Sequence, residues 1–458
     1  AILWAKPMKY RCRCRFCTPL HKGGFGKDPA VPIKRKGEIF FMKTSPLKGM
    51  RDLLPAEQAL RDYIQGQILQ TYRAAGFQRI STPMLEDMEN LDKSDGGDNL
   101  NLIFKVLKRG EKLAGALSRT PVEEKSLSDM GLRYDLTLPL SRYYAANRAE
   151  LPHPFKVIQT DRVFRAERPQ KGRLREFVQC DIDILGDESP NAEVELIDTT
   201  ARALLKIGFD DFVININDRR ILRRMLESMG FAADTLDSVC ITFDKMDKIG
   251  ADGVRNELAE KAMPEAAVQA LYDFLTQGDM SLDAVTAACG DAEISSDLRY
   301  VMACCEKLSG GRYKVAYSPS LVRGQGYYTG MVFEATSQRF GGAVAGGGRY
   351  DEMVGKFIGQ KVPAVGFSIG FERVCGLLLE QGYQIPGARP RMALLHLPDA
   401  DFAAVVAKAN TLRAEYDVSI LPQAKKLGKQ FGQLESAGFA AVAFADNDDI
   451  RHLGAKAE

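Results

Sequence analysis

The chain has 458 residues, of which 45% are hydrophobic and 27% are charged, and its formal net charge is +2. This length predicts two or three domains, and no apolar run reaches the roughly eighteen residues that a membrane-spanning helix needs. Residues 1–41 hold ten Lys and Arg against two Asp and Glu, which leaves 52 basic against 58 acidic residues in the remainder. Binding of a nucleic acid by the main body must therefore depend on local basic patches.

Cysteine and histidine usage excludes several classes of protein. The nine cysteines are scattered and odd in number, which favours a reducing compartment, and hence a cytoplasmic location, over a disulfide framework. The four histidines are scattered too, so that they predict neither a metal site nor a Ser-His-Asp constellation. The chain contains no G-x-x-x-x-G-K-[ST] sequence, so that a P-loop is not predicted.

The basic segment 1–41 shows no helical or strand period and lacks the apolar centre of a secretory signal. We expect it to be either an over-called start or a tail without catalytic importance. Its cysteines and histidine offer a zinc-knuckle alternative, which the missing second well-spaced pair disfavours; these residues are Cys12, Cys14, Cys17 and His21.

The first periodic element is an amphipathic helix over 56–76, in which apolar residues recur every three or four positions before a closing glycine. A short strand over 77–82 follows and runs into Pro83. The polar stretch 96–130 predicts a mobile loop region. In the next segment, Asp135 and Thr137 are expected on one face of a strand that ends at Pro139.

The segment from Gln159 to Gly186 predicts two strands joined by a loop, with Arg165 and Glu167 on one face of the first strand. On the second strand Gln179, Asp181 and Asp183 share one face and apolar residues share the other. Burying these charges without a ligand would cost on the order of several kcal/mol for each uncompensated charge. An open cleft that binds a charged ligand is therefore favoured.

The loop 168–176 carries four cations in nine residues. A solvated hairpin tip is one interpretation, and a polyanion that lies on the strand and meets the loop is the other. FRAE, this loop and R-x-F-x-Q together resemble the second signature motif of class II aminoacyl-tRNA synthetases. RAERPQKGRLREF is similar to the histidyl-tRNA synthetases of bacteria.

Earlier segments fit the same resemblance. The order of helix, glycine, strand and proline over 56–83 resembles the first class II motif, which implies a homodimer with this motif at its interface. LRYDLT resembles the segment that lines the amino-acid pocket in this family. Residues 42–52 resemble the beginning of the bacterial enzymes.

Beyond the hairpin, a helix is expected over 193–207, a strand over 212–216 and a mainly helical insertion over about 219–310. The insertion is either a solvated helical unit or a contact for the tRNA acceptor arm. SLVRGQGYYTGMVFE, with Arg323, Tyr327 and Tyr328, and then GGGRYD resemble the two histidine-specific segments of the family. Gln325-Gly326 stands where many relatives have Leu-Asp, so that no role is transferred to that position.

The segment 364–373 predicts a strand that runs into a helix over 371–381 and matches the third class II motif, with Arg373 as its arginine. From Arg391 onward strands and helices alternate, which predicts an α/β module. AKKLGKQF within it resembles the family's anticodon-binding domain, which is expected here in a shortened form. The predicted domains are thus an extension over 1–41, a catalytic domain over 42–385 and an anticodon-binding-like domain over 391–458.

The resemblance implies an α/β fold in which helices flank an antiparallel sheet, and the activity of a histidine–tRNA ligase. L-histidine and ATP would form histidyl-adenylate, and tRNA(His) would receive the histidyl group, with Mg²⁺ on the phosphates and no metal site built by the protein. The alternative is a non-catalytic regulatory subunit of histidine biosynthesis, and a third possibility is an inactive or truncated product. Four groups of residues carry the implied roles: Arg165 and Arg323 in catalysis; Arg165, Glu167 and Arg373 toward ATP; Asp135, Thr137, Gln179, Asp183, Arg323, Tyr327 and Tyr328 toward histidine; Gln170, Lys171, Arg173 and Arg175 toward tRNA.

Overall fold

The computed structural model describes residues 31–35, 38–93, 101–168, 174–243, 245–277, 279–289, 292–322, 326–339 and 341–454. Within these ranges, no helix is both long enough and apolar enough to cross a membrane. The six cysteines of the described ranges are all free thiols.

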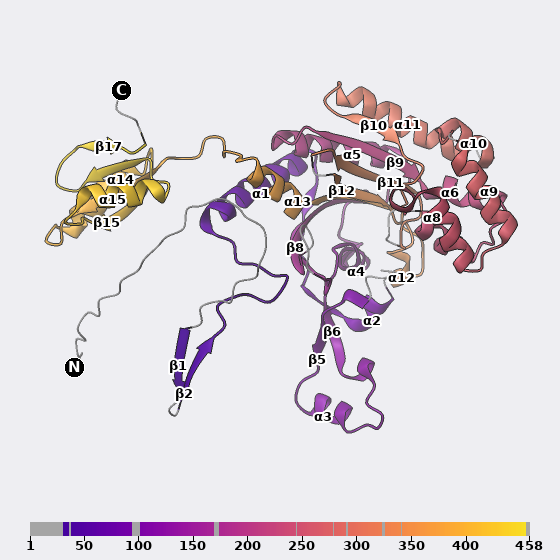
Figure 1. The fold of residues 1–458 in the computed structure, drawn as a ribbon, viewed down its shortest axis with the longest axis horizontal. Helices are drawn as coiled ribbons and strands as arrows, with labels where there is room; N and C mark the ends of the chain where they lie inside the picture. Colours follow the sequence, from indigo (N-terminus) through magenta and orange to yellow (C-terminus); the bar gives the residue numbers. More distant parts are fainter. Residues whose placement is uncertain are drawn as a thin grey trace.

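An eight-stranded sheet, which we call the main sheet, forms the centre of the molecule (Figure 1). Neighbouring strands run antiparallel except at the two edges, where the outermost strand is parallel to its neighbour. The predicted α/β class with a largely antiparallel sheet is confirmed. In order across the sheet, the strands are β10 (Lys314–Tyr317), β9 (Phe212–Asp218), β11 (Met331–Ser337), β12 (Gly342–Arg349), β13 (Ala364–Gly370), β8 (Glu176–Leu185), β7 (Phe155–Phe164) and β3 (Gln78–Arg79).

Three helices cover one face of the main sheet and share a hydrophobic core with it: α1 (Pro55–Ala74), α5 (Asn191–Lys206) and α13 (Phe371–Glu380). The helix predicted over 56–76 is confirmed as α1. Its apolar residues Leu60, Ile64, Ile68 and Tyr72 are buried because their spacing places them on one side. Gly76, at a φ of +83°, lies two residues beyond the helix, in a conformation that glycine adopts without strain.

The side chains of β8 alternate as the sequence predicts. Cys180 and Ile182 point into the helix-covered core, whereas Gln179, Asp181 and Asp183 line a pocket on the opposite face of the main sheet. The first strand of this hairpin is shorter than predicted, because β7 ends at Phe164. The predicted site residues Arg165 and Glu167 therefore lie in the chain just beyond the strand.

The strand predicted around Asp135 and Thr137 is wrong. Strand β6 (Ser128–Leu132) ends before them, and helix α4 (Thr137–Asn147) begins at the threonine. Pro139 lies in the first helical turn, where its missing N–H costs nothing because that N–H would have no partner within the helix. Pro139 thus belongs to the start of a helix and does not end a strand.

The mobile loop region predicted over 96–130 is also wrong where the structure describes it. Strand β5 (Lys105–Leu107), helix α3 (Glu111–Leu117) and the start of β6 lie there. β5 and β6 form a three-stranded sheet with β4 (Leu85–Asp87), in the order β4, β6, β5, and α2 (Met88–Asp92) follows β4. In Figure 1 β5, β6 and α3 project away from the main sheet. Two of the strands have three residues each, which is too short for alternation to be recognised in the sequence.

In its described residues, the segment predicted to be mainly helical contains six helices: α6 (Arg219–Ser228), α7 (Leu236–Phe243), α8 (Met246–Glu260), α9 (Glu265–Thr276), α10 (Leu282–Cys289) and α11 (Ala292–Ser309). Apolar residues of these helices, among them Leu258 and Leu271, belong to the same core cluster as the helices behind the main sheet. This packing makes the segment an extension of the main body's core.

A separate four-stranded sheet forms the C-terminal module, in the order β15 (Asp417–Pro422), β14 (Arg391–His396), β16 (Ala441–Phe444) and β17 (Ile450–His452). With α14 (Phe402–Leu412) and α15 (Leu427–Ser436) it encloses two small cores that contain no residue of the main body. The predicted alternation of strand and helix is confirmed, and β17 adds a strand that the sequence did not predict.

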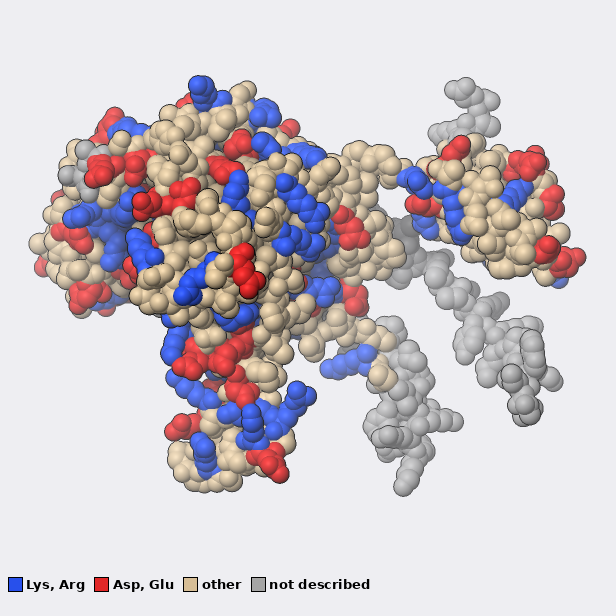
Figure 2. Space-filling view, turned by 180° about the vertical axis from the view of Figure 1, so that it is seen from behind, with Lys and Arg blue, Asp and Glu red and all other residues tan. Residues whose placement is uncertain are grey.

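Near the N-terminus, β1 (Val31–Arg35) and β2 (Glu38–Met42) form a hairpin where the sequence shows no strand period. The residues of the disfavoured zinc-knuckle alternative lie outside the described residues, namely Cys12, Cys14, Cys17 and His21. In the view of Figure 2, basic and acidic side chains are intermixed over the body and its projection. This distribution agrees with the small net charge.

Candidate active site

A pocket of about 390 Å³ lies on the face of the main sheet opposite the core helices. All nine predicted histidine- and ATP-binding residues that the structure describes line it: Asp135, Thr137, Arg165, Glu167, Gln179, Asp183, Tyr327, Tyr328 and Arg373. They come from five segments of the chain, spread between residues 135 and 373. The fold therefore brings together the residues that the motifs single out.

One end of the pocket is built by Asp135 and Thr137 from the start of α4 and by a tyrosine pair. The Tyr327 and Tyr328 rings are tilted at 59° with centroids 4.9 Å apart, and the hydroxyls of Tyr327 and Thr137 are 3.5 Å apart. The Tyr350 ring also borders this end, in a T-shaped arrangement with Tyr327. Aromatic rings beside a carboxylate make a suitable surface for a small, flat, polar group such as imidazole.

Three buried carboxylates, Asp135, Asp181 and Asp183, dominate the electrostatics of the pocket; each is at most 6% exposed. Burial raises the pKa of Asp135 to about 6, although the charge of Arg165 lowers it in part. Burial likewise raises the pKa of Asp183 to about 7, against the hydrogen bond that its Oδ1 accepts from the Tyr350 hydroxyl at 2.7 Å. The pKa of Asp181 is raised well above its ordinary value by burial and by the charge of Asp183.

Several acceptor atoms on this wall have no hydrogen-bond partner among the described residues: Asp135 Oδ2, Gln179 Oε1 and Asp181 Oδ1. A buried acceptor without a donor costs about 1–3 kcal/mol. A bound ammonium group, which carries three N–H donors, would satisfy such acceptors. The wall is thus suited to a cationic ligand.

Arg165 supplies positive charge in the middle of the pocket. Its Nε donates a hydrogen bond to the Tyr134 carbonyl at 2.9 Å, and its guanidinium carbon lies 5.1 Å from the centroid of the Phe177 ring. The backbone bond and the ring contact together fix the direction of the guanidinium group. A fixed arginine of this kind suits an oxyanion or a phosphate.

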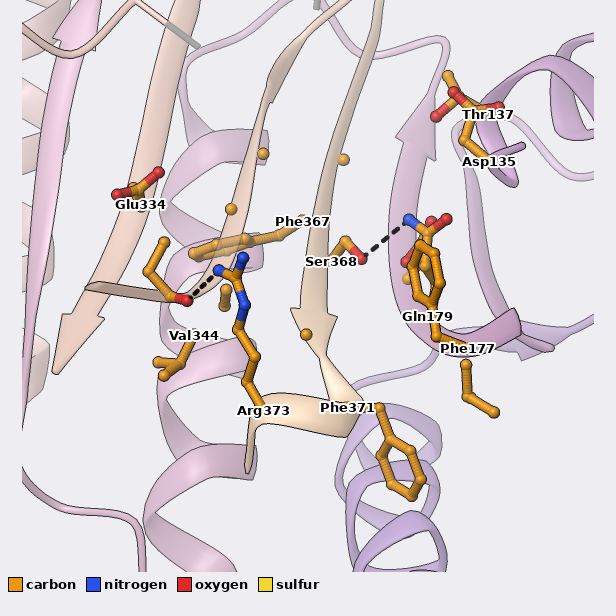
Figure 3. A pocket seen from close by; sticks show the side chains of 18 of the residues that line it. Asp135, Thr137, Phe177, Gln179, Glu334, Val344, Phe367, Ser368, Phe371 and Arg373 are labelled. Atoms are coloured by element: carbon orange, nitrogen blue, oxygen red, sulfur yellow. Dashed lines mark hydrogen bonds between the residues drawn. The ribbon is translucent and has the colours of Figure 1, made fainter. Parts of the chain in front are cut away.

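Arg373 and Glu334 lie at the other side of the pocket from Asp135 and Thr137 (Figure 3). Arg373 follows β13 at the start of α13, and its Nη1 donates a hydrogen bond to the Ala343 carbonyl at 2.5 Å. The neighbouring Glu372 is turned to α1, where Arg61 holds it through two bonds of 2.6 Å. Of these two neighbouring residues of the third motif, Arg373 thus faces the pocket, whereas Glu372 links α13 to α1.

Glycines in β12 and β13 leave the floor of the pocket without side chains at several positions. A Cβ atom at Gly366 would lie 1.9 Å from Asp183 Oδ1, and one at Gly347 would lie 2.0 Å from the Gly366 carbonyl oxygen. Neither position can therefore accept a side chain. Glycine at both positions allows a ligand to approach the backbone.

Some predicted site residues lie outside the described part of the chain, namely Arg323, Gln170, Lys171 and Arg173. Arg175 is described, and its guanidinium bonds the backbone carbonyls of Glu167 at 2.9 Å and Lys48 at 3.2 Å. In this structure it fastens the base of the basic loop to the chain before α1.

The lining residues without an assigned role from the sequence include Phe177, Asp181, Glu334 and Ser368. Alternation along β8 places Asp181 on the ligand-facing side together with Gln179 and Asp183, so that its position could be predicted. Ser368 and Glu334 could not be predicted, because their place in the pocket depends on how β13 and β11 register with their neighbours.

The raised pKa of Asp183 predicts a pH-dependent change in stability. A carboxyl whose pKa rises from 3.8 to about 7 on folding resists ionisation, so that stability falls as pH rises through this window. We expect Asp183→Asn to raise the melting temperature of the ligand-free protein at about pH 8, and to raise it less at about pH 5. Scanning calorimetry measures this difference, with the exposed Asp234→Asn as a control. An equal change at both pH values would contradict the prediction.

Comparison with known proteins gives consistent results. A family model described as histidyl-tRNA synthetase matches residues 49–374. The chain is similar to the histidine–tRNA ligase of Leifsonia xyli subsp. xyli, with 43% identity over 420 residues that cover 88% of this chain and 96% of that protein. The histidine–tRNA ligase of Porphyromonas gingivalis is 33% identical over 426 residues, which cover 89% of this chain and 93% of that protein.

Solved structures resemble this fold over most of its length. The crystal structure of histidyl-tRNA synthetase from Nostoc sp. PCC 7120 superposes with a TM-score of 0.72 at 27% identity and covers 90% of this chain and 95% of that one. A structure titled as an ATP phosphoribosyltransferase regulatory subunit/histidyl-tRNA synthetase, from Bacillus halodurans, superposes with a TM-score of 0.69 at 21% identity. The second likeness concerns the fold alone; that structure covers 88% of this chain.

Proposed function

Because the chain belongs to the histidyl-tRNA synthetase family and is a histidine–tRNA ligase, we propose that the pocket on the main sheet is where it activates histidine with ATP. The histidine carboxylate attacks the α-phosphate of ATP, and histidyl-adenylate forms as pyrophosphate leaves. The histidyl group then passes to the terminal ribose of tRNA(His), and AMP is released. The convergence of nine predicted residues on one cavity is the observation that supports this site.

At the end of the pocket near α4, the buried carboxylates receive the amino acid. Asp135 and Gln179 bind the α-ammonium group, because each presents an acceptor atom without a hydrogen-bond partner among the described residues. Asp183, held by Tyr350, accepts a hydrogen bond from the imidazole ring, and Tyr327 and Tyr328 enclose the ring with Thr137 beside them. Ionised carboxylates are required for this binding.

Arg165 stabilises the charge on the α-phosphate, and Arg323, which lies outside the described residues, is assigned the same task from the sequence. Arg373 at the far side stacks on adenine and reaches toward the γ-phosphate, with Glu167 toward the adenine amino group or a metal. No proton has to be removed from the attacking carboxylate. Catalysis therefore consists of positioning and of stabilising developing charge.

Magnesium ions in ATP sites are held by phosphates together with one or two carboxylates. Among the described residues no group of three or more His, Cys, Asp or Glu side chains could hold a metal ion. Glu167 and Glu334 line the pocket and fit the smaller requirement of an ion that arrives with ATP. When bound, Mg²⁺ would neutralise phosphate charge.

We also propose a homodimer that forms through α1 and β3, the elements that resemble the first class II motif. β3 is one of the two edge strands of the main sheet, and on one side it pairs with no strand of the described residues, so that this side can accept another chain. Sedimentation equilibrium tests this assembly. The free cysteines are compatible with the predicted cytoplasmic location.

Histidine-dependent exchange of pyrophosphate into ATP tests the proposed function. Exchange that requires histidine and no other amino acid is expected, and charging of tRNA(His) should follow when the tRNA is added. A protein that performs neither step, and whose behaviour tRNA does not alter, would support the regulatory alternative instead.

The proposed domain division predicts that the two half-reactions separate. Removing residues 391–458 should leave histidine-dependent exchange within about twofold of the full chain, because the main cores contain no residue of this module. The KM for tRNA should rise by at least about tenfold, since contacts that lie far from the acceptor end are lost. Parallel assays of exchange and charging measure both effects. Equal loss in the two assays would contradict the division.

A further inference from the structure

The carboxylate of Glu372 joins three elements beside the pocket. Glu372 is the second residue of α13, and Arg61 of α1 donates a hydrogen bond to each of its two oxygens at 2.6 Å. Its Oε1 also accepts a hydrogen bond from the backbone N–H of Val178 in β8 at 3.2 Å. One side chain thus ties the start of α13 to a helix and to a strand, and we call these three residues the α13 junction.

The bond to Val178 continues the main sheet at the point where β13 ends. Gln179 and Gly370 are the last residues that pair between β8 and β13, whereas β8 stays paired with β7 as far as Glu176. Val178 therefore lies one residue beyond the ladder, on the side where α13 begins. A backbone N–H inside a protein needs an acceptor, and the carboxylate of Glu372 supplies it.

Open space lies on both sides of the α13 junction. A second cavity, of about 290 Å³, is bordered by residues of α1, β3 and β7 and shares a wall with the pocket. The residues of this shared wall are Leu174, Phe177, Val178, Phe371 and Glu372. Side chains between two cavities have few packing contacts to fix them, so that the polar bonds of the junction decide their position. Arg61 is itself 7% exposed, with its guanidinium carbon 4.9 Å from the Phe371 ring centroid.

Residues next to the junction face the pocket. Arg373 follows Glu372 and leaves the start of α13 toward β12 (Figure 3). Phe177 precedes Val178, and its ring centroid lies 5.1 Å from the guanidinium carbon of Arg165. A shift of α13 along β8 would therefore change the spacing between the two arginines that line the pocket.

Contacts at the histidine end of the pocket involve other residues. Asp183 accepts a hydrogen bond from the Tyr350 hydroxyl at 2.7 Å, and the Tyr327 hydroxyl lies 3.5 Å from that of Thr137. This end lies across the pocket from Arg373. A change at Glu372 should therefore affect ATP and leave histidine binding as it is.

We propose that Glu372 and Arg61 are positioning residues that set the spacing between Arg165 and Arg373, and with it the affinity for ATP. This inference rests on the proposed binding of ATP by these two arginines. It assigns to a part-buried ion pair a role in binding one substrate that it does not have for the other.

The two substrates separate this role from a merely structural one. Glu372→Ala should raise the KM for ATP in histidine-dependent pyrophosphate exchange by about tenfold, the effect of misplacing one charged contact to the phosphates. The Kd for histidine, measured by isothermal titration, should stay within about twofold. Partial unfolding would lower the amount of active enzyme and hence the apparent kcat, but it would not change the KM. Assays well below the melting transition of each variant keep the two effects apart.

Other variants complete the test. Glu257→Ala is the matched control, because it removes a carboxylate that bonds Lys245 at 2.7 Å between α7 and α8, and it should keep the parent's KM for ATP. Glu372→Gln keeps an oxygen that can accept from Val178 and should recover most of the ATP affinity. Arg61→Ala should also raise the KM for ATP, and the Arg61→Ala/Glu372→Ala double variant should be no weaker than the weaker single variant.

Several outcomes would overturn the inference. An unchanged KM for ATP in Glu372→Ala, an equal loss of histidine affinity, or a Glu372→Gln variant no better than Glu372→Ala would each do so. Additive losses in the double variant would show that the two residues do not act as one unit. Arg373→Ala supplies the remaining distinction. If it leaves the KM for ATP unchanged, the proposed role of Arg373 fails, whereas a raised KM with an unaffected Glu372→Ala overturns the positioning role alone.

Discussion

Replacing Arg165 with alanine is expected to lower the rate of histidyl-adenylate formation by about a hundredfold to a thousandfold, the cost of removing one fixed oxyanion donor. The guanidinium group is held in direction by the Tyr134 carbonyl and the Phe177 ring, so that it is ready before the phosphate arrives. The effect should lie in kcat, because negative charge on the α-phosphate is greatest in the transition state. Single-turnover adenylate formation measures it.

Arg165→Lys is the matched variant for this experiment. Lysine keeps the charge but loses the fork and the Nε bond to Tyr134, so that an intermediate rate is expected. The assay is best made at about pH 8, because the charge of Arg165 lowers the pKa of Asp135, and its loss favours the protonated carboxyl. An alanine variant within about tenfold of the parent would show that Arg165 is structural.

Replacing Arg349 with alanine is expected to lower the free energy of unfolding by about 3–5 kcal/mol, the cost of breaking a buried ion pair. Arg349 bonds both carboxylate oxygens of Glu193 at 2.7 Å, and the Glu193 side chain is 1% exposed. Its remaining hydrogen bonds reach the carbonyls of Asp187 and Ser189 before α5, and Asp351 Oδ1 at 3.4 Å. The variant would leave a buried carboxyl without its partner, and burial already raises the pKa of Glu193.

A double variant separates the ion pair from the space it fills. Arg349→Met with Glu193→Leu removes both charges and keeps most of the volume, so that it should recover most of the lost stability. Thermal unfolding of the parent, the single variant and the double variant measures this. A single variant within about 1 kcal/mol of the parent would contradict the prediction.

The GGGRYD segment illustrates how far a motif predicts a role. Its glycines line the pocket, as a close approach of ligand to backbone requires. Its arginine, Arg349, instead bonds Glu193 of α5. Asp351 likewise bonds the backbone N–H of Ala364 at 3.0 Å. A motif residue can therefore serve the fold that supports a site.

The sequence by itself determined the elements with local periodicity. The helix at 56–76 and the alternation along β8 follow from spacings of 3.6 and 2.0 residues, which any short window of sequence contains. The residue types that suit a charged ligand, namely the arginines and the closely spaced carboxylates, could be found in the same way. Because they occur in motifs of known order, the family could be predicted as well.

Tertiary structure alone decided which of these side chains meet. Asp135 enters the pocket from a loop and a helix start where a strand was predicted, and Ser368 enters it through the register of β13 on β8. The basic residue Arg175 is committed to backbone carbonyls, and Arg349 to a buried glutamate. A buried charge is stabilised by whichever partner the fold brings within hydrogen-bond distance, and that partner lies too far along the chain for any local pattern to record it.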